Sequence, residues 1–134
     1  MQKKLVAAAL KIRKNAYAPY SGFKVGAAIE TQTSVYSGVN VENSSYGATI
    51  CAERNAIFQA VSREGNTVKI KGIAIATSSS PPAVPCGLCL QVISEFSSGD
   101  IPVFLVNEKG ETLKYKLSEL FPHNFTKEDL LKIH

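Results

Sequence analysis

The sequence predicts an α/β fold, a three-layer α/β/α sandwich around a mixed five-stranded sheet. Strand-like and helix-like segments alternate along the chain, and two pairs of strands are joined by short polar turns typical of hairpins. The segment 70–78, IKGIAIATS, is almost continuously apolar, as expected of a strand that is buried on both faces and needs helices above and below it. The 134 residues are 45% hydrophobic, enough for one core, so we expect a single domain over residues 1–134.

The N-terminal part of the chain predicts a helix followed by a hairpin. Leu5 and Ala9 belong to a series of apolar residues at helical spacing within residues 1–16, and lysines occupy positions between them. The segments 23–30 and 34–41 are rich in strand-forming residues and are separated by a short polar turn. We therefore expect the sheet to begin with these two strands.

The central part predicts one helix before the buried strand and one after it. Apolar residues at helical spacing define a helix over 51–64, and Gly65 supplies its stop. Three prolines, of which Pro85 is the last, prevent an earlier start of the next helix. We expect that helix over 86–96, with Gly99 as its end.

The C-terminal part predicts a second hairpin and a helical tail. The segments 102–107 and 112–117 have strand-forming character and flank the turn EKG. Short helical segments follow over 118–121 and 126–133. The expected order is helix, two strands, helix, strand, helix, two strands and tail.

Composition and charge argue against several classes of protein. Lys and Arg total 15 against 11 Asp and Glu, but the excess is scattered, so we expect no nucleic-acid partner. Lys11 interrupts the first apolar run, which is therefore not a secretory signal, and no segment approaches membrane-spanning length. We expect a cytoplasmic protein with no membrane partner. In that reducing compartment, an odd set of three cysteines is poorly suited to a disulfide framework.

The cysteines indicate another use. Cys86 and Cys89 are three positions apart and share one face of their helix, a spacing that fits a redox pair and half of a zinc site equally well. Cys51 stands at the start of the other helix, so the three thiols can converge. Three protein ligands on zinc leave one position for water, which is typical of a catalytic site rather than a structural one.

Glu53 and Arg54 follow Cys51 in the first turn of the same helix. A carboxylate beside a zinc-bound water is the usual general base, although the helix dipole alone also favours glutamate at this position. Residues two apart point to different sides of a helix, so Cys51 and Glu53 can serve one ion only if it lies beyond the helix end. Arg54 is either placed to hydrogen-bond a thiolate or is an ordinary surface arginine.

Four motifs now carry a family resemblance. CAERNA (51–56) followed by PCGLC (85–89) matches the signature of the zinc-dependent deaminases, Cys or His, any residue, Glu, then Pro-Cys-x-x-Cys. With YAPYSGFKVGAAI (17–29) and GVNVENSSY (38–46), the chain closely resembles the small homotetrameric cytidine deaminases of the three-cysteine zinc type, within the cytidine and deoxycytidylate deaminase superfamily. It departs from them at Leu90, where family members usually carry arginine.

The resemblance implies the roles of the site residues. Cys51, Cys86 and Cys89 would bind one zinc ion per chain, and Glu53 would shuttle protons. The position of Arg54, three residues after Cys51, would let it hydrogen-bond a ligand sulfur.

The resemblance also implies substrate contacts. Phe23 would stack on the pyrimidine, while Asn40 and Glu42 would hold the ribose hydroxyls; by pattern alone they read as a core aromatic and a polar strand end. Tyr46 and Phe125 would reach into a neighbouring subunit's pocket. The implied substrate contacts are Phe23, Asn40, Glu42, Ala52, Tyr46 and Phe125.

The function that the resemblance implies is hydrolytic deamination of cytidine and 2′-deoxycytidine at carbon 4, giving the uridine products and ammonia. Such a hydrolase would serve pyrimidine salvage as a cytoplasmic homotetramer whose active sites are shared between subunits. A blasticidin-S-type drug deaminase is the nearest alternative. Two further alternatives are a thiol–disulfide oxidoreductase that uses CGLC and a zinc-stabilised nucleic-acid-binding module, which would normally close its zinc site with a fourth protein ligand.

Overall fold

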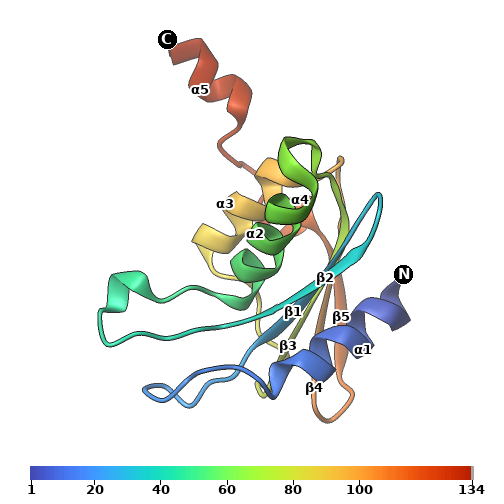
Figure 1. Ribbon diagram of the computed structural model, residues 1–134. Helices are drawn as coiled ribbons and strands as arrows, with labels where there is room; N and C mark the ends of the chain where they lie inside the picture. The colour runs from blue at the N-terminus through green and yellow to red at the C-terminus, as the bar shows by residue number, and fades with distance from the viewer. Residues whose placement is uncertain (134) are drawn as a thin grey trace.

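The computed structural model describes residues 1–133 and confirms the predicted α/β class and the predicted order of elements. A helix precedes the first hairpin, two helices flank the central strand, and the second hairpin precedes the helical tail (Figure 1). The elements are α1 (Gln2–Arg13), β1 (Gly26–Thr31), β2 (Val35–Val39), η1 (Tyr46–Ala48), α2 (Ala52–Glu64), η2 (Gly65–Thr67), β3 (Ile70–Thr77), α3 (Gly87–Phe96), β4 (Pro102–Asn107), β5 (Thr112–Lys116), α4 (Leu117–Leu120) and α5 (Lys127–Ile133).

The strands form one mixed sheet of five, in the order β2-β1-β3-β4-β5. β3 and β4 run parallel, and α3 lies in the crossover between them, whereas the other neighbouring pairs are antiparallel. A parallel pair needs such a crossover because a short turn cannot return the chain to the same end of the sheet. The predicted mixed five-stranded sheet is therefore confirmed.

Helices cover both faces of the sheet, which gives the three predicted layers (Figure 1). α1 packs Leu5 and Ala9 on one face, against small residues such as Ala28 and Ala74. On the other face, α2 and α3 pack on larger aliphatic side chains such as Ile75 of β3. Because β3 is buried on both faces, its sequence lacks the polar alternation of a half-exposed strand.

Two glycines allow helices to lie unusually close to the first hairpin. A Cβ at Gly26 of β1 would stand 2.3 Å from the carbonyl oxygen of Ala9 in α1. A Cβ at Gly38 of β2 would stand 2.5 Å from the backbone nitrogen of Ala56 in α2. Both distances are shorter than van der Waals contact allows, so these positions need a residue without a side chain.

The first predicted strand begins later than expected, at Gly26 instead of residue 23. The side-chain amide of Asn40 donates a hydrogen bond to the carbonyl oxygen of Phe23 and accepts one from the N–H of Val25. These backbone groups therefore do not take part in the regular hydrogen bonding between strands. The predicted helix over 86–96 agrees with α3, which ends at Phe96. Gly99 is not its cap, however, because the chain already turns into extended backbone at Ser97.

Candidate active site

Cys51 and Cys86 occupy equivalent positions at the heads of two helices. Each is the N-cap residue of its helix, α2 for Cys51 and α3 for Cys86, and each has extended backbone angles. Cys89 follows one turn later in α3 and is fully buried. Both helices therefore direct their N-terminal, partly positive ends at the same group of sulfurs, which favours negative charge there.

The three sulfur atoms converge. The Sγ atoms of Cys51, Cys86 and Cys89 all lie within 4.8 Å of one another, and those of Cys51 and Cys86 are 4.0 Å apart. Tetrahedral zinc with Zn–S bonds of the usual length separates its sulfur ligands by roughly 3.8 Å. The donor set and its spacing fit Zn²⁺. Among the residues that the structure describes, these cysteines are the only cluster of three or more potential metal ligands from His, Cys, Asp and Glu.

Arg54 lies beside the sulfurs, in agreement with the interpretation that it hydrogen-bonds a thiolate and not with that of an ordinary surface arginine. Its guanidinium donates a hydrogen bond of 3.4 Å from Nη2 to the Sγ atom of Cys51. The pKa of Cys51 falls to about 5 because the thiol of Cys89 and the guanidinium of Arg54 both hydrogen-bond its sulfur. The same contact and burial raise the pKa of Cys89. Of these two thiols, Cys51 is therefore the one that more readily forms the thiolate.

Glu53 lies in the first turn of α2, two residues after the N-cap Cys51, and is only 5% exposed. Burial raises the pKa of Glu53 to about 7, and the negative charge of Cys51 adds to the effect. A carboxyl group that titrates close to neutral pH is suited to both accepting and donating protons.

A cavity of about 320 Å³ contains Glu53 and two of the cysteines. Apolar side chains line it together with polar ones that include Asn40 and Glu42. The predicted residues at its wall are Phe23, Asn40, Glu42, Cys51, Ala52, Glu53 and Cys86. Ser21, Val25, Thr49, Ile50, Ile75, Thr77, Ala83 and Val84 also line it and were not predicted.

Those missed residues had little sequence signal. Ile75 and Thr77 belong to a strand whose pattern indicates only burial, and Ala83 and Val84 stand in a proline-rich loop before Cys86. Ser21 is the exception, because it lies inside the quoted segment YAPYSGFKVGAAI.

Phe23 is attached to Asn40 through its backbone. The side chain of Asn40, 8% exposed, donates from Nδ2 to the carbonyl oxygen of Phe23 at 2.8 Å and accepts from the N–H of Val25 at 2.8 Å. Asn55 of α2 donates from Nδ2 to the carbonyl oxygen of Val39 at 2.7 Å, which fixes the chain just before Asn40. These bonds set the cavity wall that carries the aromatic ring.

Glu42 faces the turn that precedes Phe23. Its Oε1 atom accepts hydrogen bonds from the N–H groups of Tyr20 (3.0 Å) and Ser21 (3.1 Å), and its Oε2 atom accepts one from the Ser21 hydroxyl. The Ser21 hydroxyl and the two N–H groups lower the pKa of Glu42 below its ordinary value. The carboxylate is therefore ionised at neutral pH.

Tyr46 and Phe125, predicted to reach a neighbouring subunit, lie outside the cavity of their own chain. Tyr46 belongs to η1, is 84% exposed, and lines a separate surface hollow together with Tyr20 and Glu42. Phe125 is 48% exposed in the segment before α5, where Nε2 of Gln91 donates to its carbonyl oxygen at 2.9 Å.

The loop before Cys86 is hydrogen-bonded to the tip of the second hairpin. Asn107, at the end of β4, donates from Nδ2 to the carbonyl oxygen of Ser79 at 3.0 Å. The hydroxyl of Ser80 donates to Oε1 of Glu111 at 2.5 Å, and Asn107 also donates to Glu111. The turn between β4 and β5 thus holds the segment that leads to Cys86.

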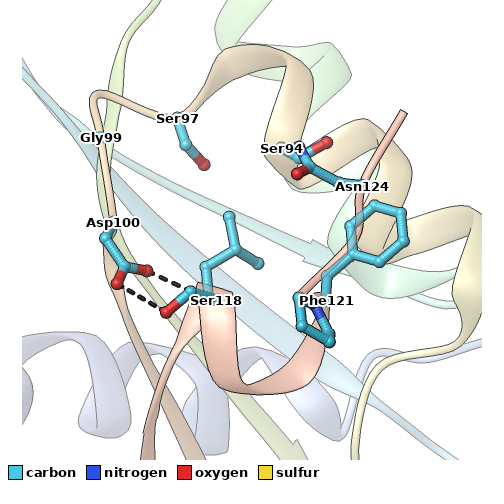
Figure 2. A pocket seen from close by; sticks show the side chains of 9 residues that line it. Ser94, Ser97, Gly99, Asp100, Ser118, Phe121 and Asn124 are labelled. Atoms are coloured by element: carbon cyan, nitrogen blue, oxygen red, sulfur yellow. Dashed lines mark hydrogen bonds between the residues drawn. The ribbon is translucent and has the colours of Figure 1, made fainter. Parts of the chain in front are cut away.

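A second cavity, of about 380 Å³, lies at the other end of α3 (Figure 2). Ser94 and Ser97 line it from the helix side, and Asp100, Phe121 and Asn124 from the following segments. The carboxylate of Asp100 accepts hydrogen bonds from the N–H and the hydroxyl of Ser118, at 2.9 and 2.7 Å. This cavity contains no cysteine and no glutamate, so the first cavity is the candidate active site.

The chain is similar to known deaminases over most of its length. Residues 1–105 match the family described as "Cytidine and deoxycytidylate deaminase zinc-binding region". A cytidine deaminase of Sporosarcina psychrophila is 45% identical over 129 residues, which cover 96% of this chain and 93% of the relative. A blasticidin-S deaminase of Bacillus cereus is 31% identical over 114 residues, 77% of each chain.

The fold gives the same result. The crystal structure of a cytidine deaminase from Burkholderia pseudomallei superposes with a TM-score of 0.85 at 40% sequence identity, covering 93% of this chain and 99% of that chain. No helix within residues 1–133 combines the length and apolar character that crossing a membrane requires. From the matched family, the relatives and the shared fold, the chain belongs to the cytidine and deoxycytidylate deaminase family.

Proposed function

We propose that the protein is a hydrolase that deaminates cytidine and 2′-deoxycytidine to uridine and 2′-deoxyuridine with release of ammonia. The observation that carries the proposal is the convergence of three cysteine sulfurs within 4.8 Å, next to the cavity that contains the buried carboxyl group of Glu53. The family and the cytidine deaminases among the relatives support the same substrate class. They favour this reading over the thiol–disulfide oxidoreductase and the nucleic-acid-binding module.

One zinc ion per chain is the proposed cofactor, held by Cys51, Cys86 and Cys89. Zn²⁺ supplies a Lewis acid that lets water lose a proton near neutral pH. Arg54 and the two helix N-termini offset the negative charge of the thiolates. Three ligands from the chain leave one coordination position for the reaction.

Glu53 is the proposed proton carrier. Its carboxylate would accept a proton from the attacking water and deliver it to ring nitrogen 3 while the carbon–oxygen bond forms at carbon 4. A second proton, relayed by the same group, would go to the amino nitrogen as the carbon–nitrogen bond breaks and ammonia leaves. Only 5% of Glu53 is exposed, which limits exchange of its proton with bulk water.

The other cavity residues are proposed to bind the nucleoside. All of them line the cavity: the ring of Phe23 would stack on the pyrimidine, Ala52 would contact the base, and Asn40 and Glu42 would bind the ribose. The carboxylate of Glu42 accepts hydrogen bonds that ribose hydroxyls donate.

The active protein is proposed to be a homotetramer. The exposure of Tyr46 and Phe125, both apolar for most of their surface, supports a role for these side chains in a neighbouring subunit's pocket. Light scattering should give the mass of four chains. A mixture of chains carrying Glu53→Gln with chains carrying Phe125→Ala should regain activity after reassembly, because some pockets would then combine an intact Glu53 with an intact Phe125.

The proposed cellular role is pyrimidine salvage in the cytoplasm. Three unpaired cysteines support this compartment, because a reducing environment keeps thiols available as metal ligands.

An absorbance assay tests the proposed function. The purified protein is given cytidine, 2′-deoxycytidine, their monophosphates and blasticidin S side by side. We expect turnover of both nucleosides. Blasticidin S is the second candidate substrate because of the relative from Bacillus cereus, and turnover of that compound alone would replace the proposal.

A further inference from the structure

We infer that Ser21 is a positioning residue that couples the sugar contact Glu42 to the base contact Phe23, and thereby makes the pocket specific for a nucleoside with free sugar hydroxyls. The inference rests on the proposed function, since it assumes a nucleoside substrate. Ser21 lines the same cavity as Glu42 and Phe23.

Ser21 joins the two contacts through one hydroxyl group. Its Oγ atom donates to Oε2 of Glu42 and accepts a hydrogen bond of 3.0 Å from the N–H of Phe23. Its own N–H donates to Oε1 of Glu42 at 3.1 Å. A continuous chain of hydrogen bonds therefore runs from the backbone of Phe23 through Ser21 to both oxygens of the carboxylate.

The turn geometry makes this chain possible. Gly22 has a φ of 72°, in the left-handed region, and its N–H donates to the carbonyl oxygen of Ala18 at 2.9 Å. The chain reverses at this point, which lets the N–H of Phe23 return to the hydroxyl of Ser21.

The carboxylate retains acceptor capacity for a substrate. Oε1 receives two N–H groups from the turn, whereas Oε2 receives only the Ser21 hydroxyl among the described contacts. Each carboxylate oxygen can accept about two hydrogen bonds. Oε2 is therefore the atom that can accept from a sugar hydroxyl, and the Ser21 hydroxyl fixes its direction.

Without the hydroxyl of Ser21, Oε1 of Glu42 keeps its two N–H donors, but Oε2 loses the hydrogen bond that fixes its direction and the N–H of Phe23 loses its acceptor. The effect should fall on the discrimination between sugars, because a misdirected carboxylate no longer distinguishes a nucleoside with hydroxyls from one without them. The zinc ligands and Glu53 lie on α2 and α3 and do not contact Ser21 through any hydrogen bond found in residues 1–133.

The test compares kcat/KM for cytidine and 2′,3′-dideoxycytidine in the zinc-loaded enzyme. In Ser21→Ala, we expect the preference for cytidine over the dideoxy compound to fall about tenfold or more, the range for a lost hydrogen bond to a charged group, through KM for cytidine rather than through kcat. Ser21→Thr should restore the preference, and Ser21→Val, which has the shape of threonine without its hydroxyl, should not. Ser62→Ala, an exposed serine on α2, is the matched control.

The outcomes separate the two claims. If the wild-type enzyme does not deaminate cytidine, the proposed function fails and this inference fails with it. If the wild type is active but Ser21→Ala slows both substrates equally, the residue is merely structural and the inference alone is wrong. Should the alanine variant not fold, the comparison of the threonine and valine variants decides the question in the same way.

Discussion

The side-chain amide of Asn40 holds the carbonyl oxygen of Phe23 at 2.8 Å, although the two residues are 17 positions apart in the chain. The same amide accepts the N–H of Val25. Asn40 therefore shapes the aromatic wall of the pocket from behind, in addition to any contact with the sugar.

Asn40→Asp tests the two hydrogen bonds that the Asn40 side chain makes to the backbone of Phe23 and Val25. Aspartate keeps the acceptor for Val25 but places a second oxygen against the carbonyl of Phe23, so one favourable bond becomes a repulsive contact. We expect the free energy of unfolding to fall by about 1–3 kcal/mol and KM for cytidine to rise about tenfold. Urea denaturation and steady-state kinetics measure the two effects. Asn66→Asp, on the exposed η2 turn, is the control and should change neither.

Glu53→Gln tests the proton carrier. Glutamine has nearly the same shape but cannot exchange a proton, so we expect zinc content to stay at one ion per chain while kcat falls by roughly 100- to 10,000-fold, the range for general acid–base catalysis. Metal analysis and the nucleoside assay are run on the same preparation. Substantial turnover in this variant would refute the assignment of Glu53.

Cys89→Ala tests the metal site. Removing one of three sulfurs leaves two ligands, so we expect most of the zinc to be lost, together with the activity. A chelator should lower the melting temperature of the wild-type protein but not that of the variant, because ligand-linked stabilisation requires a bound ion. Leu88→Ala changes the exposed neighbour on the same helix and should retain zinc. Full zinc content in Cys89→Ala would contradict the three-sulfur site.

Gly38→Ala tests the close contact between β2 and α2. The new methyl group would lie 2.5 Å from the backbone nitrogen of Ala56 and 2.8 Å from the carbonyl oxygen of Ala52, and backbone atoms cannot move aside as a side chain can. We expect a loss of about 1–3 kcal/mol, seen as a lower melting temperature. Activity should fall as well, because the displaced helix carries Cys51 and Glu53. Gly47→Ala adds the same methyl group where no atom lies within 4 Å, and should have little effect.

Much of the fold follows from local patterns in the sequence. The helix over 51–64 is recognisable because its apolar residues repeat at helical spacing and Gly65, with a φ of 78°, ends it. The apolar run of β3 indicates burial on both faces, and hence three layers. The order of the five strands is set by tertiary packing and is not contained in any single segment.

The parts that could not be predicted depend on contacts between distant residues. β1 starts at Gly26 because the side chain of Asn40 hydrogen-bonds the N–H of Val25, and no pattern in residues 23–30 predicts this contact. The spacing of the cysteines made convergence possible, but the sulfur distances depend on how α2 and α3 pack side by side on the sheet. Ser21 was missed because a serine in a turn is usually explained by the turn alone.

The bonds between the tip of the second hairpin and the loop at Ser79 and Ser80 have a practical consequence for labelling. A surface turn between two strands is ordinarily the first place at which an epitope, a fluorophore or a whole reporter domain is grafted. In this protein we expect a graft between Asn107 and Glu111 to strain the hydrogen bonds to Ser79 and Ser80, and so to displace the segment that leads to Cys86, one of the proposed zinc ligands.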